Sequence, residues 1–499
     1  MKILLSNIPA YIKDPERHYN GAGSQRWSAT YKIRKGDPGA AEWKYMEYPF
    51  NIGYSTALLK RDTDWTVKAW DPCVLDLDVN DFRSYVKSYS PDILLVEVPT
   101  VAFPLMLPIL GELKKEVGFK LAVSGPHITG IPEDTMNEYK FIDFGLVGEY
   151  ELTLRELVNS YSKFPSGFEE IHGLAFRHGD SVKVNQRRML IDPLDQLPFP
   201  DREDLPAQRY EDAVFADTPC IQMLSSRGCP VGCTFCVPIQ TMFASSMYRR
   251  RSPKEIVDEM ILVKDKYGAR QVYFDDDTMV INKKHVQAVC QEIIDRKVDL
   301  PWSCMGDITI AEDALKMMAD AGFCGIKFGV DSVTPQALKA VHKGTVTTDK
   351  VTTFVQKCKN LGIKTHASFV VGLPSDTREG VYNMVDYALH LGVDNAQFSI
   401  ATPFPGTPFF EEAKAKGWLR TYDWTQYDGE RTAVLNYPNL SSKEIEELRQ
   451  YAVDTWFKHM VKTTMKNPKN MMLQIRRRGL KGSITGIKAV MKGKYVLNG

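Results

Sequence analysis

The sequence predicts an α/β protein with two parallel-sheet domains joined by an extended connector. Through residues 1–160, nearly continuous apolar segments alternate with helical segments, a pattern typical of a doubly wound parallel sheet. The alternation resumes at Cys220 and runs through six strand–helix units, which predicts a partial (β/α)6 barrel of the TIM type. A proline-rich stretch at residues 192–201 separates the two regions and is expected to be extended.

The first domain is expected to span residues 1–160. Its predicted strands cover residues 2–6, 66–70, 93–98, 120–124 and 144–147, and its predicted helices cover residues 52–60, 81–89, 105–117 and 151–160. Residues 1–7 fit a strand better than a signal peptide. Because ligands of such sheets bind at the carboxyl ends of strands, the loops at residues 98–100, 124–129 and 148–151 are candidate binding loops. The long insertion at residues 9–50 is expected to form a lid or substrate wall.

The rest of the chain divides into a connector at 161–216, a barrel at 217–415 and a helical C-terminal region at 416–499. The connector is expected to hold a small hairpin across Gly179-Asp180. The predicted barrel strands cover residues 221–224, 271–274, 302–305, 326–330, 364–371 and 396–400, each followed by a helix. Ser441 and Glu444 form a capping-box pattern that opens a helix over residues 445–460.

The composition is that of a globular protein with a sizeable core. Of the 499 residues, 43% are hydrophobic and 25% charged, with a net charge of +1, and no apolar run reaches the length of a membrane span. Six of the nine cysteines are scattered without a pairing pattern, which favours a reducing cytoplasm. Residues 455–499 carry 11 Lys or Arg and no acidic residue. This basic tail fits attachment to an anionic membrane face or a solvated terminus, and its few aromatics argue against nucleic acid.

The remaining three cysteines, Cys229, Cys233 and Cys236, lie within eight residues. Three thiolates on one loop can hold three irons of a cubane cluster and leave the fourth iron open. Gly228 and Gly232 suit a loop that wraps tightly around an inorganic core. A zinc ribbon would need a second cysteine pair, and a thioredoxin-type site would be a single Cys-x2-Cys pair. The spacing therefore favours an iron–sulfur cluster.

This spacing, with an aromatic residue before the last cysteine, resembles the radical SAM superfamily. The resemblance implies a [4Fe-4S] cluster whose open iron binds S-adenosylmethionine (SAM), which is cleaved to a 5′-deoxyadenosyl radical. It also implies SAM contacts at the carboxyl ends of the barrel strands. The candidate SAM residues are Phe235, Asp275, Asp276, Asp277, Asp331, Ser332, Gly372 and Pro403. Three adjacent carboxylates could also form a metal site or a solvated acidic turn.

Two turns of the first domain, Ser124-Gly125-Pro126-His127 and Gly148-Glu149-Tyr150-Glu151, resemble those of cobalamin-binding domains attached to radical SAM enzymes. The resemblance implies that this domain binds cobalamin. The candidate cobalamin residues are Thr100, Ser124, Gly125, His127, Gly148 and Glu149. The Asp-x-His-x-x-Gly motif of cobalamin-dependent mutases is absent from the sequence. The sequence therefore names no cobalt ligand, and His127 is expected to be a structural or pocket residue.

Taken in order, these motifs are similar over residues 1–420 to the radical SAM branch that contains hopanoid-modifying enzymes and the anaerobic Mg-protoporphyrin monomethyl ester cyclase. The resemblance implies a cytoplasmic, cobalamin-dependent methyltransferase that acts on a carbon of a hydrophobic, hopanoid- or tetrapyrrole-like substrate. A flavodoxin- or ferredoxin-type electron donor is expected, as is peripheral membrane contact through the basic tail. The alternatives are an oxidative cyclase with the same cofactors and a non-catalytic cobalamin- or metal-binding sensor. A methylthiotransferase would need a further cysteine trio.

Overall fold

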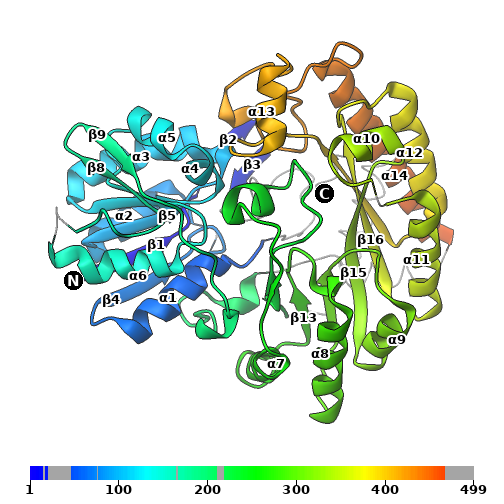
Figure 1. Ribbon diagram of the computed structural model, residues 1–499, viewed down its shortest axis with the longest axis horizontal. Helices are drawn as coiled ribbons and strands as arrows, with labels where there is room; N and C mark the ends of the chain where they lie inside the picture. Colours follow the sequence, from blue (N-terminus) through cyan, green and yellow to red (C-terminus); the bar gives the residue numbers. More distant parts are fainter. Residues whose placement is uncertain are drawn as a thin grey trace.

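The structure is a computed structural model that describes residues 1–9, 11–14, 17–20, 46–75, 77–163, 167–210, 219–344 and 346–466. Two sheet-based domains lie side by side in it (Figure 1). A short hairpin of β2 (Tyr11–Asp14) and β3 (Arg17–Asn20) lies in the predicted lid. Residues 46–50 at its end are also described, whereas residues 21–45 and the basic tail beyond Lys466 lie outside the described residues.

The first domain is built on a seven-stranded sheet in the order β4-β1-β5-β6-β7-β8-β9. Its five parallel strands are β4 (Thr66–Trp70), β1 (Lys2–Ser6), β5 (Ile93–Glu97), β6 (Lys120–Ser124) and β7 (Phe144–Leu146). The hairpin predicted in the connector, β8 (Leu174–His178) and β9 (Ser181–Val184), adds two antiparallel strands at the edge. The first sheet therefore continues into the region that the sequence suggested as a connector.

Helices cover both faces of this sheet, as predicted for a doubly wound fold. One hydrophobic core includes residues of α1 (Phe50–Asp62) and α6 (Glu151–Ser160). The other includes residues of α2 (Val79–Tyr89), α3 (Phe103–Val117) and α5 (Pro132–Glu138). A strand packed on both faces is nearly continuously apolar, and β5, whose five residues are all buried, is apolar except for Glu97 at its end.

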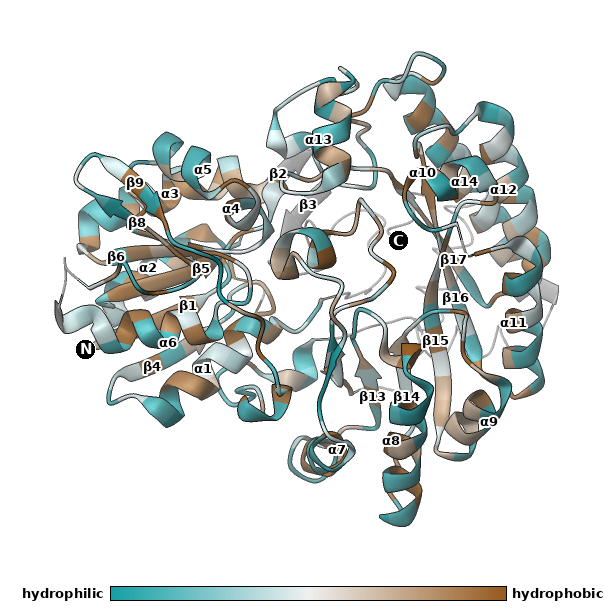
Figure 2. Ribbon diagram, in the orientation of Figure 1, coloured by the Kyte–Doolittle hydropathy of each residue, from teal (hydrophilic) through white to brown (hydrophobic). Residues whose placement is uncertain are grey.

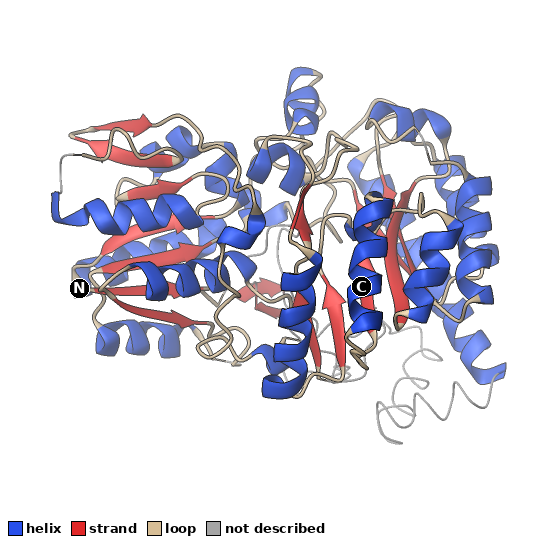
Figure 3. Cartoon of the chain, turned by 60° about the horizontal axis from the view of Figure 1, so that its bottom comes forward, coloured by secondary structure: helices blue, strands red, loops and turns tan. Residues whose placement is uncertain are grey.

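The second domain is a six-stranded, all-parallel sheet curved into a partial barrel, with the strands in the order of the sequence. The strands are β10 (Cys220–Met223), β13 (Gln271–Phe274), β14 (Trp302–Met305), β15 (Phe323–Asp331), β16 (Lys364–Val371) and β17 (Asn395–Ile400). The helices are α7 (Pro253–Tyr267), α8 (Lys283–Asp295), α9 (Glu312–Asp320), α10 (Pro335–Ala340), α11 (Thr348–Asn360) and α12 (Arg378–Leu391). Figure 3 shows helices along the outer side of these strands.

Side chains alternate along each barrel strand between an apolar outer face and a largely polar inner face. The outer residues, such as Phe274, Ile326 and Phe369, belong to the main hydrophobic core, and the apolar colour in Figure 2 is concentrated on the strands and the helix faces toward them. Successive side chains of a strand point to opposite faces. The inner residues therefore include Gln271, Tyr273, Ser303, Met305, Lys327, His366, Ser368, Val370, Gln397 and Ser399.

The C-terminal region begins with α13 (Pro408–Ala415) and ends with α14 (Ser442–Lys466), which packs against β17 and α12. The predicted capping box is confirmed. The Ser441 N–H donates to Glu444 Oε2 at 2.9 Å, and the Glu444 N–H donates to Ser441 Oγ at 3.4 Å. Among the described helices, none combines the length and apolar character that a membrane-spanning segment needs.

The two domains touch where α4 (Pro126–Gly130) meets the loop after β17. A Cβ atom on Gly130 would lie 2.4 Å from the Pro405 carbonyl oxygen, and one on Gly406 would lie 2.5 Å from the Gly130 Cα. Both obstacles are backbone atoms, which cannot rotate away. Only glycine therefore allows these two segments to approach so closely.

Replacing Gly130 with alanine should weaken the contact between the domains. The added methyl group must push two backbones apart, and overpacking of this kind costs about 1–3 kcal/mol. We expect a lower thermal unfolding midpoint for Gly130→Ala, measured by scanning fluorimetry. The control is Gly344→Ala, where the nearest atom to a new Cβ is 3.9 Å away. Equal midpoints for the two variants would contradict the packing argument.

Candidate active site

The three cysteines lie on a loop between β10 and the π-helical turn η5 (Pro238–Phe243), at the carboxyl end of the barrel strands. Each thiol is partly buried. Cys229 and Cys236 pack against a small apolar cluster of η5 residues. Figure 1 shows that this loop occupies the side of the barrel next to the first domain.

Two of the three adjacent carboxylates hold the cysteine loop in place. Asp276 accepts hydrogen bonds from the Ser225 N–H at 2.8 Å and from both serine hydroxyls, that of Ser226 at 2.5 Å and that of Ser225. Asp277 accepts from the Gly228 N–H at 2.8 Å. These bonds explain how the buried Asp276 carboxylate is tolerated at this position. A direct contact of Asp275, Asp276 or Asp277 with SAM stays a prediction.

Glycine at position 228 is required by both its backbone angle and its surroundings. Its φ is +94°, and a Cβ there would lie 2.1 Å from the Met247 carbonyl oxygen. On the other side of the loop, the Gln240 side chain donates to the carbonyl oxygens of Gly232 and Cys233 at 3.0 and 2.9 Å. The loop is therefore fixed by hydrogen bonds before and after its first cysteine.

The surroundings of the three thiols disfavour free thiolates. Burial raises the pKa of Cys229 to about 11 and that of Cys233 to about 12, and it raises the pKa of Cys236 further. Metal binding must therefore displace protons from all three. Among the described residues, no three His, Cys, Asp or Glu side chains gather as ligands of one ion. In a cubane, each of the three thiolates would bind a different iron.

The other candidate SAM residues also lie at the carboxyl ends of barrel strands. Asp331 ends β15 with φ +62°, and its carboxylate accepts a hydrogen bond from Lys343 Nζ at 2.5 Å. Ser332 follows it and is buried. Gly372, after β16, has φ +86° and donates its N–H to Asp376 at 3.0 Å. Pro403 is buried in the turn after β17. Phe235 packs against the main core.

The candidate cobalamin residues lie together at the carboxyl edge of the first sheet. Thr100 begins the turn η1 (Thr100–Ala102) after β5, and Ser124 ends β6. Gly125 has φ +109°, and a Cβ there would lie 2.8 Å from the Val98 carbonyl oxygen. Thr100 Oγ1 and His127 Nδ1 are buried and accept or donate no hydrogen bond within the described part of the chain. Such orphaned polar atoms fit a site that a polar ligand completes.

His127 is enclosed by aromatic rings from both domains. Its ring centroid lies 4.3 Å from that of Phe103 and 5.1 Å from that of Trp424 in the turn η7 (Trp424–Gln426) of the C-terminal region. Burial lowers the pKa of His127 to about 3, so its imidazole is neutral. This environment agrees with the expected role as a structural or pocket residue.

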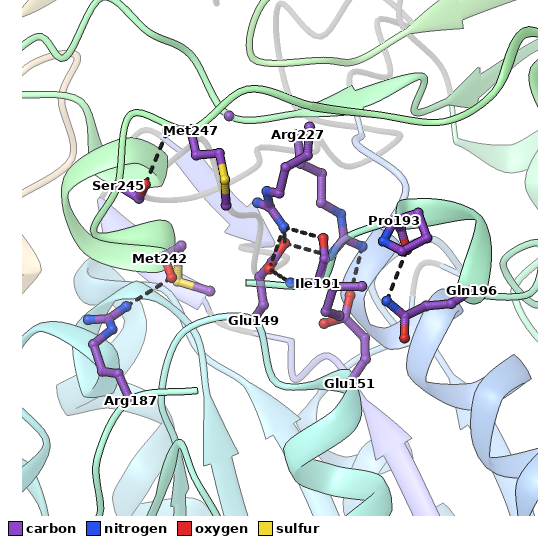
Figure 4. A network of polar contacts seen from close by, with 12 residues as sticks. Glu149, Glu151, Arg187, Ile191, Pro193, Gln196, Arg227, Met242, Ser245 and Met247 are labelled. Carbon is purple, nitrogen blue, oxygen red and sulfur yellow. Dashed lines mark hydrogen bonds and ion pairs between the residues drawn. The ribbon is translucent and has the colours of Figure 1, made fainter. Parts of the chain in front are cut away.

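Glu149, by contrast, takes part in a buried ionic network between the domains (Figure 4). It accepts from Arg227 Nη1 at 3.0 Å and from Arg249 Nη1 at 2.6 and 2.8 Å. Arg227 Nη2 also donates to Glu151 at 2.7 Å. The four side chains are at most 3% exposed. Burial alone would lower the pKa of Arg227, but the Glu151 and Glu149 carboxylates raise it above its usual value.

Sequence reasoning missed most of this network. Glu151 lies in the turn after the fifth predicted strand and Arg227 lies two residues before Cys229, and neither stands in a pattern that predicts a role. Arg249 is far from both in the sequence and meets Arg227 only because β11 (Ser226–Arg227) pairs with β12 (Arg249–Arg250). Arginines beside a cofactor loop are a weak signal, since most are solvated.

With the geometry established, similarity to known proteins identifies the family. The chain matches the model of the radical SAM superfamily over residues 223–388. An uncharacterized methyltransferase of Pyrococcus horikoshii is 30% identical over 413 residues, which cover 82% of this chain and 87% of the relative. The chain belongs to the radical SAM superfamily. It is therefore an enzyme that uses a [4Fe-4S] cluster and SAM, as its cysteine spacing indicated.

Other relatives of this radical SAM enzyme are more distant. The cytidylyl-2-hydroxyethylphosphonate methyltransferase of Streptomyces wedmorensis is 24% identical, over 66% of this chain and 67% of the relative. The anaerobic magnesium-protoporphyrin IX monomethyl ester cyclase of Rubrivivax gelatinosus is 27% identical, over 78% of this chain and 70% of the relative.

Two solved structures share the fold of both domains. The radical SAM methyltransferase TsrM of Kitasatospora setae, solved with cobalamin and a [4Fe-4S] cluster, aligns with a TM-score of 0.64 at 19% identity, over 90% of this chain and 85% of that one. The cobalamin-dependent radical SAM enzyme OxsB aligns with a TM-score of 0.70 at 14% identity, over 97% of this chain and 72% of that one. The predicted fold class is therefore confirmed.

Removing a cluster ligand should abolish the cluster. We expect Cys229→Ser to lose most of its iron and acid-labile sulfide after anaerobic reconstitution, because two remaining thiolates cannot hold a cubane stably. The matched control is Cys324→Ser, because Cys324 is partly buried and donates to the Trp302 carbonyl oxygen on the barrel. Full iron content in Cys229→Ser would remove Cys229 from the ligand set.

A buried acid below the first-domain loops should make stability depend on pH. Burial raises the pKa of Glu97 from 4.5 to about 8, although the Tyr150 hydroxyl, which donates to it at 3.3 Å, opposes the shift. Between pH 4.5 and 8 the unfolded chain ionises Glu97 while the folded protein keeps its proton. The stabilising contribution of this carboxyl is therefore lost as pH rises through that window.

Glu97→Gln should remove this dependence, because glutamine mimics the neutral acid. At each pH we compare the thermal midpoint of Glu97→Gln with that of the wild type. The midpoint of the variant minus that of the wild type should be larger at pH 8 than at pH 5. The exposed Glu133→Gln on α5 serves as the control for the general effect of replacing a glutamate with glutamine. A Glu97→Gln difference that is equal at both pH values would contradict the buried, protonated state.

Proposed function

We propose that this protein is a cobalamin-dependent radical SAM methyltransferase that transfers a methyl group to a carbon of its substrate. The observation that carries the proposal is the direct contact between the two loop-bearing edges. The Gly148-Glu149 loop of the first sheet lies against η5 and the cysteine loop of the barrel, and a Cβ on Gly148 would lie 2.9 Å from the Met242 carbonyl oxygen. A ligand at the first edge would thus be close to a cluster at the second.

The residues of the first domain fit cobalamin as a resident cofactor. Gly125 and Gly148 keep the two loops close to neighbouring backbone, while Thr100 Oγ1 and His127 Nδ1 are polar atoms that a bound cofactor would satisfy. The Gly148 N–H donates to Thr129 Oγ1 at 3.1 Å, which fixes the loop. These features support Thr100, Ser124, Gly125, His127 and Gly148 as contacts of cobalamin. Glu149 would support that site indirectly, because its ion pairs with Arg227 and Arg249 hold the loop in place.

When bound, SAM at the cluster would supply a hydrogen-abstracting radical and cobalamin a transferable methyl group. The protein's own part is to hold, orient and shield. Cys229, Cys233 and Cys236 would fix the cluster, and Asp276 and Asp277 hold their loop. Lys343 neutralises Asp331 at the strand end where the SAM contact is predicted. Apolar packing against Cys229 and Cys236 partly shields the thiols from water.

The side chains on the inner face of the barrel indicate which class of substrate would fit. A hydrophobic substrate remains the expectation, but Gln271, Ser303 and His366 line this face with hydrogen-bonding groups, and Lys327 adds a positive charge. Lys327 Nζ lies 4.5 Å from the ring centroid of Tyr273. We therefore propose a carbon-rich substrate that also carries polar groups. The reducing donor and membrane contact through the basic tail stay predictions.

An oxidative cyclase with the same cofactors is the second candidate, and the cyclase relative favours keeping it. Released products separate the two. A methyltransferase that turns over its substrate releases both S-adenosylhomocysteine and 5′-deoxyadenosine. Release of 5′-deoxyadenosine alone would contradict the methyl-transfer proposal. A non-catalytic sensor would show no reductive cleavage of SAM by the reconstituted protein.

The cofactor content tests the proposal before any substrate is known. We expect anaerobically purified protein, reconstituted with iron, sulfide and hydroxocobalamin, to retain cobalt and cluster together after gel filtration. Metal analysis and the visible absorption spectrum provide the measurement. Retention of the cluster without cobalamin would leave a radical SAM enzyme and refute the cobalamin-dependent function.

A further inference from the structure

The network between the domains links the two loops that the proposed function depends on. Arg227 is two residues before Cys229, so its backbone is part of the cysteine loop. Its partners Glu149 and Glu151 follow β7, at the carboxyl edge of the first sheet. Figure 4 shows both glutamates reaching from the first domain toward Arg227. The Arg227 guanidinium therefore joins the cysteine loop to the loop of the proposed cobalamin site.

The geometry of this link leaves it little freedom. Arg227 donates through separate nitrogens to two carboxylates, at 3.0 and 2.7 Å. Arg249 shares the first carboxylate, which also accepts the Ile191 N–H at 3.0 Å. Two cations and two anions balance in charge. A planar guanidinium bound at two points fixes orientation as well as distance, which a lysine ammonium cannot do.

The loops on either side of the link are stiff. Gly228 packs against the Met247 backbone and donates its N–H to Asp277. Gly148 packs against the Met242 backbone and donates its N–H to Thr129. Arg187 adds a clamp, since its Nη2 donates to the carbonyl oxygens of Thr241 and Met242 at 2.6 and 2.9 Å. A shift of Arg227 relative to the glutamates would therefore move one whole loop against the other.

Stability alone is a poor reason for such a network. Desolvating charged groups costs about as much as their attraction returns, and apolar replacements of similar volume are often as stable. The network is also placed at the meeting point of the two loops rather than within either domain core. Its distinctive effect is to select one relative placement of the domains.

We propose that Arg227 is a positioning residue, which sets the separation of the iron–sulfur cluster and the cobalamin by binding Glu149 and Glu151. The inference rests on the proposed function, because it requires both cofactors. It predicts that loss of the Arg227 link changes the distance or the order between them without removing either one.

The test measures the magnetic interaction between the two cofactors in full-length protein. Reconstituted samples, reduced so that the cluster and cobalt(II) are both paramagnetic, are compared by electron paramagnetic resonance. Wild-type protein should show dipolar broadening of the cluster signal. Arg227→Met should keep its iron, sulfide and cobalamin but lose that broadening. Arg227→Lys, which can reach only one carboxylate at a time, should recover it only in part.

A control variant breaks a similar buried pair away from the cysteine loop. Arg202 donates to Glu259 at 2.9 Å, and both side chains are at most 1% exposed. Arg202→Met should lose stability as Arg227→Met does and yet keep the broadening. If Arg227→Met does not assemble, Glu151→Gln decides, because it removes one charge from the same link at nearly constant shape.

The outcomes separate the inference from the function beneath it. Unchanged broadening in cofactor-loaded Arg227→Met, or in Glu151→Gln when that variant decides, would overturn the positioning role alone. Equal loss of broadening in Arg202→Met would also overturn it, because the effect would then be general destabilisation. Wild-type protein that binds a cluster but no cobalamin would refute the proposed function, and the inference would fall with it.

Discussion

The active site depends on charged groups that are buried at the boundary between two domains. Glu149 and Glu151 come from one domain and Arg227 and Arg249 from the other, and none of the four is more than 3% exposed. Each charge removed from water must meet an opposite charge with good geometry, or the fold is penalised by several kcal/mol. The domains can satisfy this requirement only in one relative arrangement. That arrangement places the candidate cofactor loops against each other.

Close backbone packing also restricts how the two domains can be placed relative to each other. Gly130 and Gly406 let the domains approach to a distance at which side chains would collide, and Gly148 does the same beside η5. Since these contacts are short and involve backbone atoms, they define a narrow range of positions. Hydrogen bonds from Asp276 and Asp277 extend the constraint into the cysteine loop. The result is a preorganised site, in which little ordering remains to be done when cofactors bind.

The candidate site was predictable where chemistry follows from residue type and spacing. Three cysteines in one short loop, glycines at sharp turns and polar residues after apolar strands can be read from the chain. The direction of the Asp276 and Asp277 side chains could not be read in this way. The residue types predict a contact with SAM, which stays a prediction, whereas the structure shows the two carboxylates accepting hydrogen bonds from the N–H groups of Ser225 and Gly228. A carboxylate accepts any nearby donor, and which donor is near depends on the fold.

The sequence by itself determined the two parallel sheets, their order and the loop on which three cysteines gather, because hydrophobic periodicity and cysteine spacing are local properties. It placed the hairpin of β8 and β9 correctly but could not assign it to the first sheet, since strand pairing joins residues far apart in the chain. The tertiary structure alone decided that Glu149 meets Arg227 and Arg249, that Trp424 covers His127, and that the two loop-bearing edges face each other. Burial and long-range contact create these relations, and no local pattern encodes them.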